Sequence, residues 1–156
     1  MKKSFAERIE IMNNMYKLPA NCLPTIPANV ASRLPKFKRT LLDEVAEIDE
    51  IDPSLPPLEL TTAIADVLGD IIVYCRSEAL KYGIPLEDIL DIIMDSNESK
   101  LGADGKPIYN EDGKFLKGPN YFKPEPAISK RLNAGVGVLD LRVHSLGIDS
   151  EGGSHD

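Results

Sequence analysis

The sequence predicts an all-α fold, a bundle of about four to five helices with one ordered polar loop or small hairpin near residues 103–121. Apolar residues recur at helical spacing through most of the first hundred positions, and Pro and Gly stand where these stretches begin and end. Only near 103–121 do two Asp-Gly turn signals replace the helical period. With 156 residues and 42% hydrophobic composition, one domain with a buried core is expected.

The first helix is expected from Ser4 to about residue 17. Ser4 and Glu7 have the spacing of a capping box, and the apolar residues that follow lie along one stripe. Three prolines between residues 18 and 29 then predict an irregular segment, because proline has no backbone N–H to donate. Such a segment can form one wall of a pocket.

Three further helices are expected over residues 30–51, 58–82 and 85–99. The second starts at residue 30 or at Pro35, which suits a first helical turn or marks a kink. Gly83 follows the third helix in the position where glycine commonly ends helices. Since the third helix has more apolar residues than one thin stripe requires, it is expected to be central to the bundle.

The expected organisation is a main domain over residues 1–126, followed by a C-terminal extension over 127–149. A short helix is expected within the extension, from Ala127 to Asn133. The last residues, 150–156, are polar and Gly-rich, so we expect a disordered tail.

The formal net charge of −7 and a pI near 4.9 argue against binding to a nucleic acid polymer through a basic face. No apolar stretch approaches the length of a membrane span, so neither a membrane partner nor a membrane location is expected. Cys22 and Cys75 do not form a Cys-x-x-Cys pattern and are interpreted as reduced thiols. These features predict a soluble cytoplasmic protein.

Four carboxylates at helical spacing are the main candidates for chemistry. Glu44 and Glu47 are three residues apart, and Asp66 and Asp70 are four apart on the next helix, so each pair shares a helix face. Like charges on facing helices repel, and a cation offsets that cost. Solvated helix faces are the alternative interpretation. The apolar neighbours of Asp70 over residues 67–74 argue against it for that residue.

Oxygen ligands favour Mg²⁺, or else Mn²⁺, over other metals. The only histidines are His144 and His155, and neither follows a glutamate at the Glu-x-x-His spacing of di-iron bundles. The sequence also lacks the clustered Cys and His of zinc sites and the ligand pattern of an EF-hand loop.

A second group of candidates follows at the end of the fourth helix. Asn97 and Lys100 share a helix face and either bind a phosphate or sugar, or complement the helix C-terminus. Further polar and basic residues follow in the expected loop: Lys114, Lys117, Asn120 and Tyr121.

Taken together, the segments 42–47, 65–70 and 96–101, with the loop motifs between 104 and 121, resemble the all-α nucleoside triphosphate pyrophosphohydrolase superfamily. The resemblance is to its MazG-like and phosphoribosyl-ATP pyrophosphohydrolase-like branch and covers roughly residues 6–126. It implies hydrolysis of a nucleoside triphosphate between the α and β phosphates, in nucleotide-pool control or house-cleaning. It also implies self-association as a homodimer or a dimer of dimers.

The resemblance implies that Glu44, Glu47 and Asp70 are catalytic residues that bind Mg²⁺. Val67 stands where the family usually has a metal-binding Glu, and Asp66, one residue earlier, looks like the variant of this branch and a fourth metal ligand. Whether Glu47 binds the metal or orients the attacking water stays open.

By the same resemblance, Asn97 and Lys100 contact the nucleotide, and Lys114 and Lys117 place positive charge near the leaving group. Base recognition is expected from the less regular parts of the chain. A non-catalytic helical protein that binds a nucleotide or a protein partner is the alternative function, and Val67 keeps it open. The candidates for base recognition are Asn14, Tyr16, Phe37, Asn120 and Tyr121.

Overall fold

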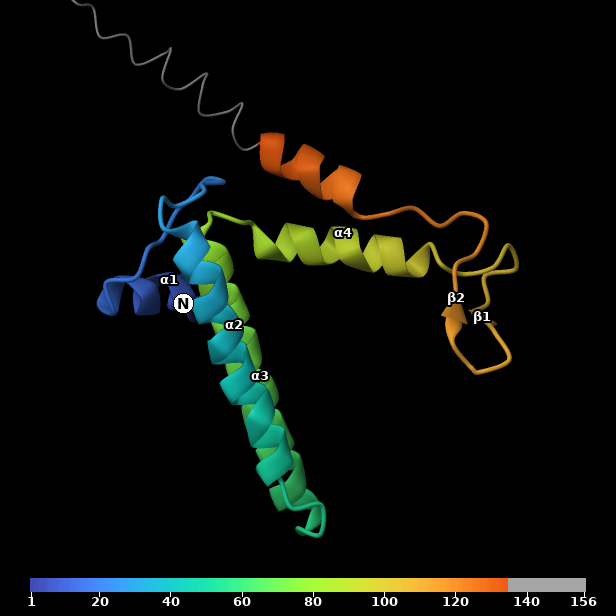
Figure 1. The fold of residues 1–156 in the computed structure, drawn as a ribbon, viewed down its shortest axis with the longest axis horizontal. Coiled ribbons are helices and arrows are strands. Elements are labelled where there is room, and N and C mark those ends of the chain that lie inside the picture. The colour runs from blue at the N-terminus through green and yellow to red at the C-terminus, as the bar shows by residue number, and fades with distance from the viewer. Residues whose placement is uncertain (135–156) are drawn as a thin grey trace, which may run out of the picture. The chain divides into compact units, whose positions relative to one another are not determined.

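The computed structural model describes residues 1–134 and divides into two compact units, the first Met1–Asp88 and the second beginning at Ile89. α-Helices dominate the described residues, and a small two-stranded sheet accompanies them (Figure 1). The fold is therefore all-α, as predicted. No helix within 1–134 combines the length and apolar character needed to cross a bilayer.

Helix α1 (Phe5–Met15) begins with the predicted capping box. The Ser4 backbone N–H donates to Glu7 Oε2 (2.6 Å), and the Glu7 N–H donates to Ser4 Oγ (3.2 Å). The helix ends slightly before the expected residue 17, because Lys17 adopts a positive φ of 55°. Local signals alone thus account for the position of α1.

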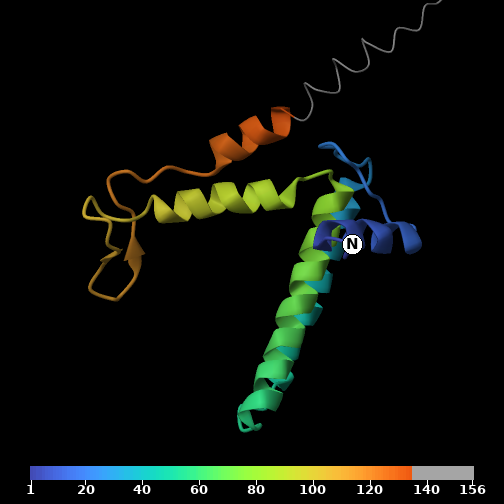
Figure 2. The same cartoon turned by 180° about the vertical axis from the view of Figure 1, so that it is seen from behind.

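In the first unit, α2 (Val30–Ala46) and α3 (Pro57–Lys81) run antiparallel and lie side by side (Figures 1 and 2). Pro35 lies inside α2 and does not start it, and a 3₁₀ turn, η1 (Glu47–Glu50), continues the chain beyond α2. Helix α3 also packs against α1 and η1, so its predicted central place holds within this unit.

The irregular segment 18–29 packs against the C-terminal end of α3. Backbone N–H groups of Asn21 and Thr25 donate to the carbonyls of Leu80 and Tyr82, both at 2.9 Å. These bonds satisfy carbonyls that a helix end leaves without partners. Gly83 has the predicted role, with φ +64°, and a Cβ there would stand 1.8 Å from the Leu23 carbonyl oxygen. Both the positive φ and the close approach of the Leu23 carbonyl therefore require glycine at this position.

Asn13 ties α1 to α3 through a contact that the sequence does not predict. Its side chain is completely buried. Its Nδ2 donates to the carbonyls of Pro19 (3.1 Å) and Ser77 (3.3 Å), and Ser77 Oγ donates to its Oδ1 (2.7 Å). Because each polar atom of this buried amide has a partner, the contact holds α1 at one place on α3.

Helix α4 (Leu86–Glu98) leads into the second unit. The predicted hairpin is present as β1 (Ile108–Tyr109) and β2 (Phe115–Leu116), antiparallel, with Ile108 opposite Leu116. The chain is helical again from 125 to 134, starting two residues before the expected helix. The expected tail over 150–156 and most of the extension lie outside the described residues.

The core of the first unit is small. Its buried apolar side chains are Ile9, Val67 and Ala79. The apolar surroundings expected for Asp70 are wrong, because Asp70 is exposed and its neighbours Leu68 and Ile72 are 54% and 57% exposed. Only one stripe of α3 faces α1 and α2, and Leu68 and Ile72 lie off that stripe.

Candidate functional site

A pocket of about 440 Å³ lies within the first unit, among α1, α2 and α3. The lining residues on α2 and on α3 each recur every three or four positions, so each set is one helix face. The α1 side is mainly apolar, whereas the two longer helices bring charge. The lining residues are Met12, Tyr16 and Leu18 from the α1 side, Arg33, Lys36, Phe37 and Thr40 from α2, and Asp70, Val73, Tyr74, Ser77, Glu78 and Lys81 from α3.

Carboxylates gather beyond one end of this pocket. Burial raises the pKa of Glu44, and the negative charges of Glu47 and Asp70 raise it further. A hydrogen bond from Tyr74 acts in the opposite direction on that pKa. Glu44 Oε2 is buried and has no hydrogen-bond partner within the described residues. Glu47 on η1 and Asp70 on α3 are thus close enough to Glu44 on α2 for their charges to act on it.

This carboxylate group has the properties that a hard cation relieves. Mutual repulsion and a buried oxygen without a donor both cost free energy, and a divalent cation removes both costs. Within residues 1–134, however, no group of three or more Asp, Glu, His or Cys side chains is placed so that it could hold a metal ion. Asp66 is exposed one turn before Asp70 and is not among the charges that act most strongly on Glu44.

Tyr74 is a site residue that the sequence analysis missed. It lines the pocket one helical turn after Asp70. The negative charge of Glu44 is the main cause that raises the pKa of Tyr74, with burial and Asp70 acting in the same direction. A phenol kept protonated next to a carboxylate is a hydrogen-bond donor to it. The i, i+4 spacing from Asp70 is the signal that would have found it.

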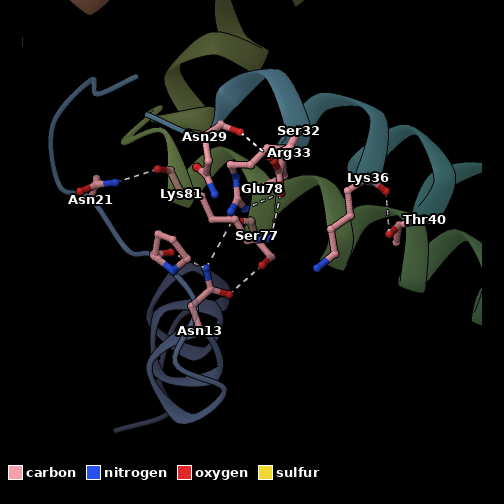
Figure 3. Close-up of polar contacts among 11 residues, drawn as sticks. Asn13, Asn21, Asn29, Ser32, Arg33, Lys36, Thr40, Ser77, Glu78 and Lys81 are labelled. Carbon is pink, nitrogen blue, oxygen red and sulfur yellow. Dashed lines mark hydrogen bonds and ion pairs between the residues drawn. The ribbon is translucent and has the colours of Figure 1, made fainter. Parts of the chain in front are cut away.

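Cations occupy the other end of the pocket. Glu78 Oε2 lies 2.8 Å from Lys81 Nζ and 3.4 Å from Arg33 Nη2, and these three side chains are 9%, 14% and 15% exposed. Figure 3 shows Arg33 and Lys81 meeting at Glu78, with Lys36 extending separately from α2. The sequence analysis missed this cluster. The available signal is the cationic run over 33–39, which precedes the acidic run over 43–50.

The second unit has a separate pocket of about 330 Å³, lined by Asn97, Lys100, Phe115 and Lys117. Lys100 Nζ donates to Asn97 Oδ1 (2.6 Å), and Lys117 Nζ lies 4.4 Å from the centre of the Tyr121 ring. The structure therefore brings together most of the predicted substrate residues of this unit.

The remaining predicted substrate residues are more scattered. Lys114 and Asn120 do not line this second pocket, and Phe37 lines the pocket of the first unit instead. Tyr16 joins Phe37 there, whereas Asn14 is exposed elsewhere on α1. Phe115 is a lining residue that the sequence analysis did not select.

Comparisons with known proteins add little to this geometry. No family model matches the chain, and no curated protein matches it in sequence. Among solved structures, the chain is similar to a crystal structure of a provisionally named NTP pyrophosphohydrolase from Exiguobacterium sp. 255-15. The two share 19% identity with a TM-score of 0.49, over 87% of this chain and 98% of that one. At that distance, function has to be argued from the residues of this chain.

Proposed function

We propose that the protein is a nucleoside triphosphate pyrophosphohydrolase of the MazG-like type, dependent on Mg²⁺ or Mn²⁺. It would convert a ribo- or deoxynucleoside triphosphate to the monophosphate and pyrophosphate, in nucleotide-pool control. The observation that carries the proposal is the pairing of Glu44, Glu47 and Asp70 with a pocket whose far end is cationic. A metal-bound triphosphate needs carboxylates for the metal and cations for the remaining phosphate charge.

In this proposal Glu44, Glu47 and Asp70 bind Mg²⁺, and Asp66 is a more distant fourth ligand. When bound, Mg²⁺ neutralises phosphate oxygens and lowers the pKa of a bound water. Tyr74 holds the Glu44 carboxylate in one orientation through its hydroxyl.

The reaction would take place at the carboxylate end of the pocket. Glu47 would use its second carboxylate oxygen, the one not committed to the metal, to accept a proton from the attacking water as the water oxygen bonds to the α-phosphorus. The bond from that phosphorus to the α,β-bridging oxygen breaks, and pyrophosphate leaves with the electron pair.

The nucleotide contacts are proposed for each unit separately. In the first unit, Phe37 offers an aromatic face for a base in the 440 Å³ pocket. In the second unit, the pocket with Asn97, Lys100 and Lys117 suits a phosphate, because two ammonium groups line one cavity. Further contacts are proposed from Lys114, Asn120 and Tyr121.

Self-association, as a homodimer or a dimer of dimers in the cytoplasm, belongs to the same proposal. Its support is the exposed apolar surface of the α2–α3 pair: α2 has no buried residue, and Leu42, Leu68 and Ile72 are 56%, 54% and 57% exposed. Monomeric proteins rarely leave large contiguous apolar patches uncovered. Light scattering of the full chain measures the mass directly.

The decisive experiment is incubation with a panel of nucleoside triphosphates, with and without Mg²⁺, followed by separation of the products. Monophosphate and pyrophosphate are expected, and EDTA should abolish their formation. Glu44→Gln is expected to remove turnover, whereas Glu50→Gln, an exposed glutamate on η1, is the matched control. Release of orthophosphate in place of pyrophosphate would contradict the proposal.

A non-catalytic nucleotide-binding regulator is the second candidate function. Val67 favours it, because the side chain at the family's usual Glu position is buried, with 6% exposure, and cannot bind a cation. This function predicts nucleotide binding without product formation, and little change of binding in Glu47→Gln. Turnover that depends on Glu47 in a cooperatively folded variant would rule it out.

A further inference from the structure

We infer that Lys36 and Arg33 bind the terminal phosphates of a polyphosphate chain and thereby make the pocket of the first unit selective for triphosphates. This inference deepens the proposed function and rests on it. Its starting point is an imbalance of charge at the far end of the pocket, where Arg33, Lys36 and Lys81 face a single carboxylate, Glu78.

The hydrogen bonds show which of these cations is available. Arg33 and Lys81 both approach the same oxygen, Glu78 Oε2, so one negative charge serves two cations. Lys36 forms no ion pair with any residue in 1–134, and Arg33 Nε has no hydrogen-bond partner there. Figure 3 shows the Lys36 ammonium apart from the Glu78 cluster. An excess of two positive charges therefore remains for a bound anion.

The spacing along α2 fits an extended anion. Thr40 and Lys36 lie about one and two helical turns before Glu44, at most about 12 Å along the axis at 1.5 Å per residue. Lys36 and Thr40 line the pocket, and Glu44 follows on the same helix face, so a linear ligand can run along these positions. A single phosphate at the carboxylate end does not extend over this spacing, whereas a polyphosphate tail covers more of it.

The charges also set the direction of the tail. Asp70 marks the end where Glu44 and Glu47 gather, and that end suits the metal-bound phosphate that is attacked. The β and γ phosphates then point to Lys36 and Arg33, where fixed positive charge stabilises the departing pyrophosphate. Glu78 weakens this attraction but is itself neutralised by Arg33 and Lys81.

The first test measures binding without turnover. The full chain is titrated calorimetrically with inorganic tripolyphosphate, with and without Mg²⁺. Lys36→Met is expected to weaken binding about tenfold, which corresponds to about 1.4 kcal/mol. Lys36→Arg should retain binding. Lys38→Met is the matched control, since Lys38 is exposed on the same helix and does not line the pocket.

The second test uses nucleoside triphosphates and diphosphates with the same base. In the wild-type protein the triphosphate should have the higher kcat/KM, and Lys36→Met should reduce that preference. Equal tripolyphosphate affinity in Lys36→Met and Lys38→Met, or no binding to the wild type, overturns the inference even if turnover persists. Lys36-dependent binding without any turnover overturns the hydrolase proposal instead and supports the anion site.

Discussion

The two units each have a pocket lined by lysine and an aromatic ring, but their remaining residues differ. In the first unit, carboxylates from α2, η1 and α3 lie next to the pocket, and in the second unit no carboxylate lines the pocket. Phosphoryl chemistry needs a cation site and an anion site close together, whereas lysines alone allow binding only. In the proposed function, the chemistry therefore belongs to the first unit.

The two pockets also differ in how they are held. The first lies on facing helices, which the buried Asn13–Ser77 hydrogen bonds and the segment 18–29 hold in place. The second depends on a hairpin whose strands are exposed, with Phe115 at 42% exposure. Positions on packed helices are held more precisely than those on short exposed strands, which fits the proposed catalysis in the first unit and the proposed binding in the second.

The largest expected effect tests where the chemistry occurs. Glu47→Gln should lower kcat at least about 100-fold, the usual scale for removing a general base. Steady-state kinetics with a triphosphate substrate measures it, and cooperative thermal unfolding shows that the variant folds. If Lys117→Met lowers kcat as much, the assignment of chemistry to the first unit fails.

The next effect compares the buried polar contacts of the two units. Asn13→Ala should lower the free energy of unfolding by about 2–3 kcal/mol, because it leaves buried Ser77 groups without partners. Ser96→Ala in the second unit removes one bond, from Ser96 Oγ to the Phe122 carbonyl, and should cost about 1 kcal/mol. Urea denaturation measures both, and the reverse order would contradict the greater rigidity assigned to the first unit.

A smaller effect is expected for phosphate binding in the second unit. Lys117 stacks on Tyr121 and lies in an exposed part of the chain. Lys117→Met should raise KM about two- to fivefold with kcat unchanged, the range of exposed charge interactions. The effect should shrink as salt is added, because screening weakens exposed charges. A change in kcat without a change in KM would speak against a binding role.

The smallest effect is a pH dependence that belongs to the first unit. Burial, and after it the neighbouring carboxylates, raise the pKa of Glu44 above its ordinary 4.5. Between pH 4.5 and the raised pKa the folded protein therefore binds more protons than the unfolded one. Stability of the metal-free protein should therefore fall as pH rises from about 4.5 through the raised pKa. Thermal scans measure this, and Glu44→Gln should remove the dependence. A rise in the stability of the metal-free protein over the same pH range would contradict this prediction.

Much of the local structure could be predicted because its causes lie within a few residues. The Ser4–Glu7 capping box, the positive φ of Gly83 and the Asp-Gly hairpin all depend on neighbours in the sequence. The grouping of Glu44 and Glu47 followed from helical spacing in the same way. That both lie near Asp70 was predicted by the expectation that the two acidic helices face each other.

Other features depended on how α1 and α2 align with α3, which no local pattern encodes. Asn13 meets Ser77 across 64 positions, and Arg33 meets Glu78 across 45. The same alignment left Asp70 exposed, because it decided which stripe of α3 is covered. By itself the sequence determined the helices and the carboxylate spacing. Only the tertiary structure decided which charges share a pocket, because packing sets the rotation and axial position of each helix.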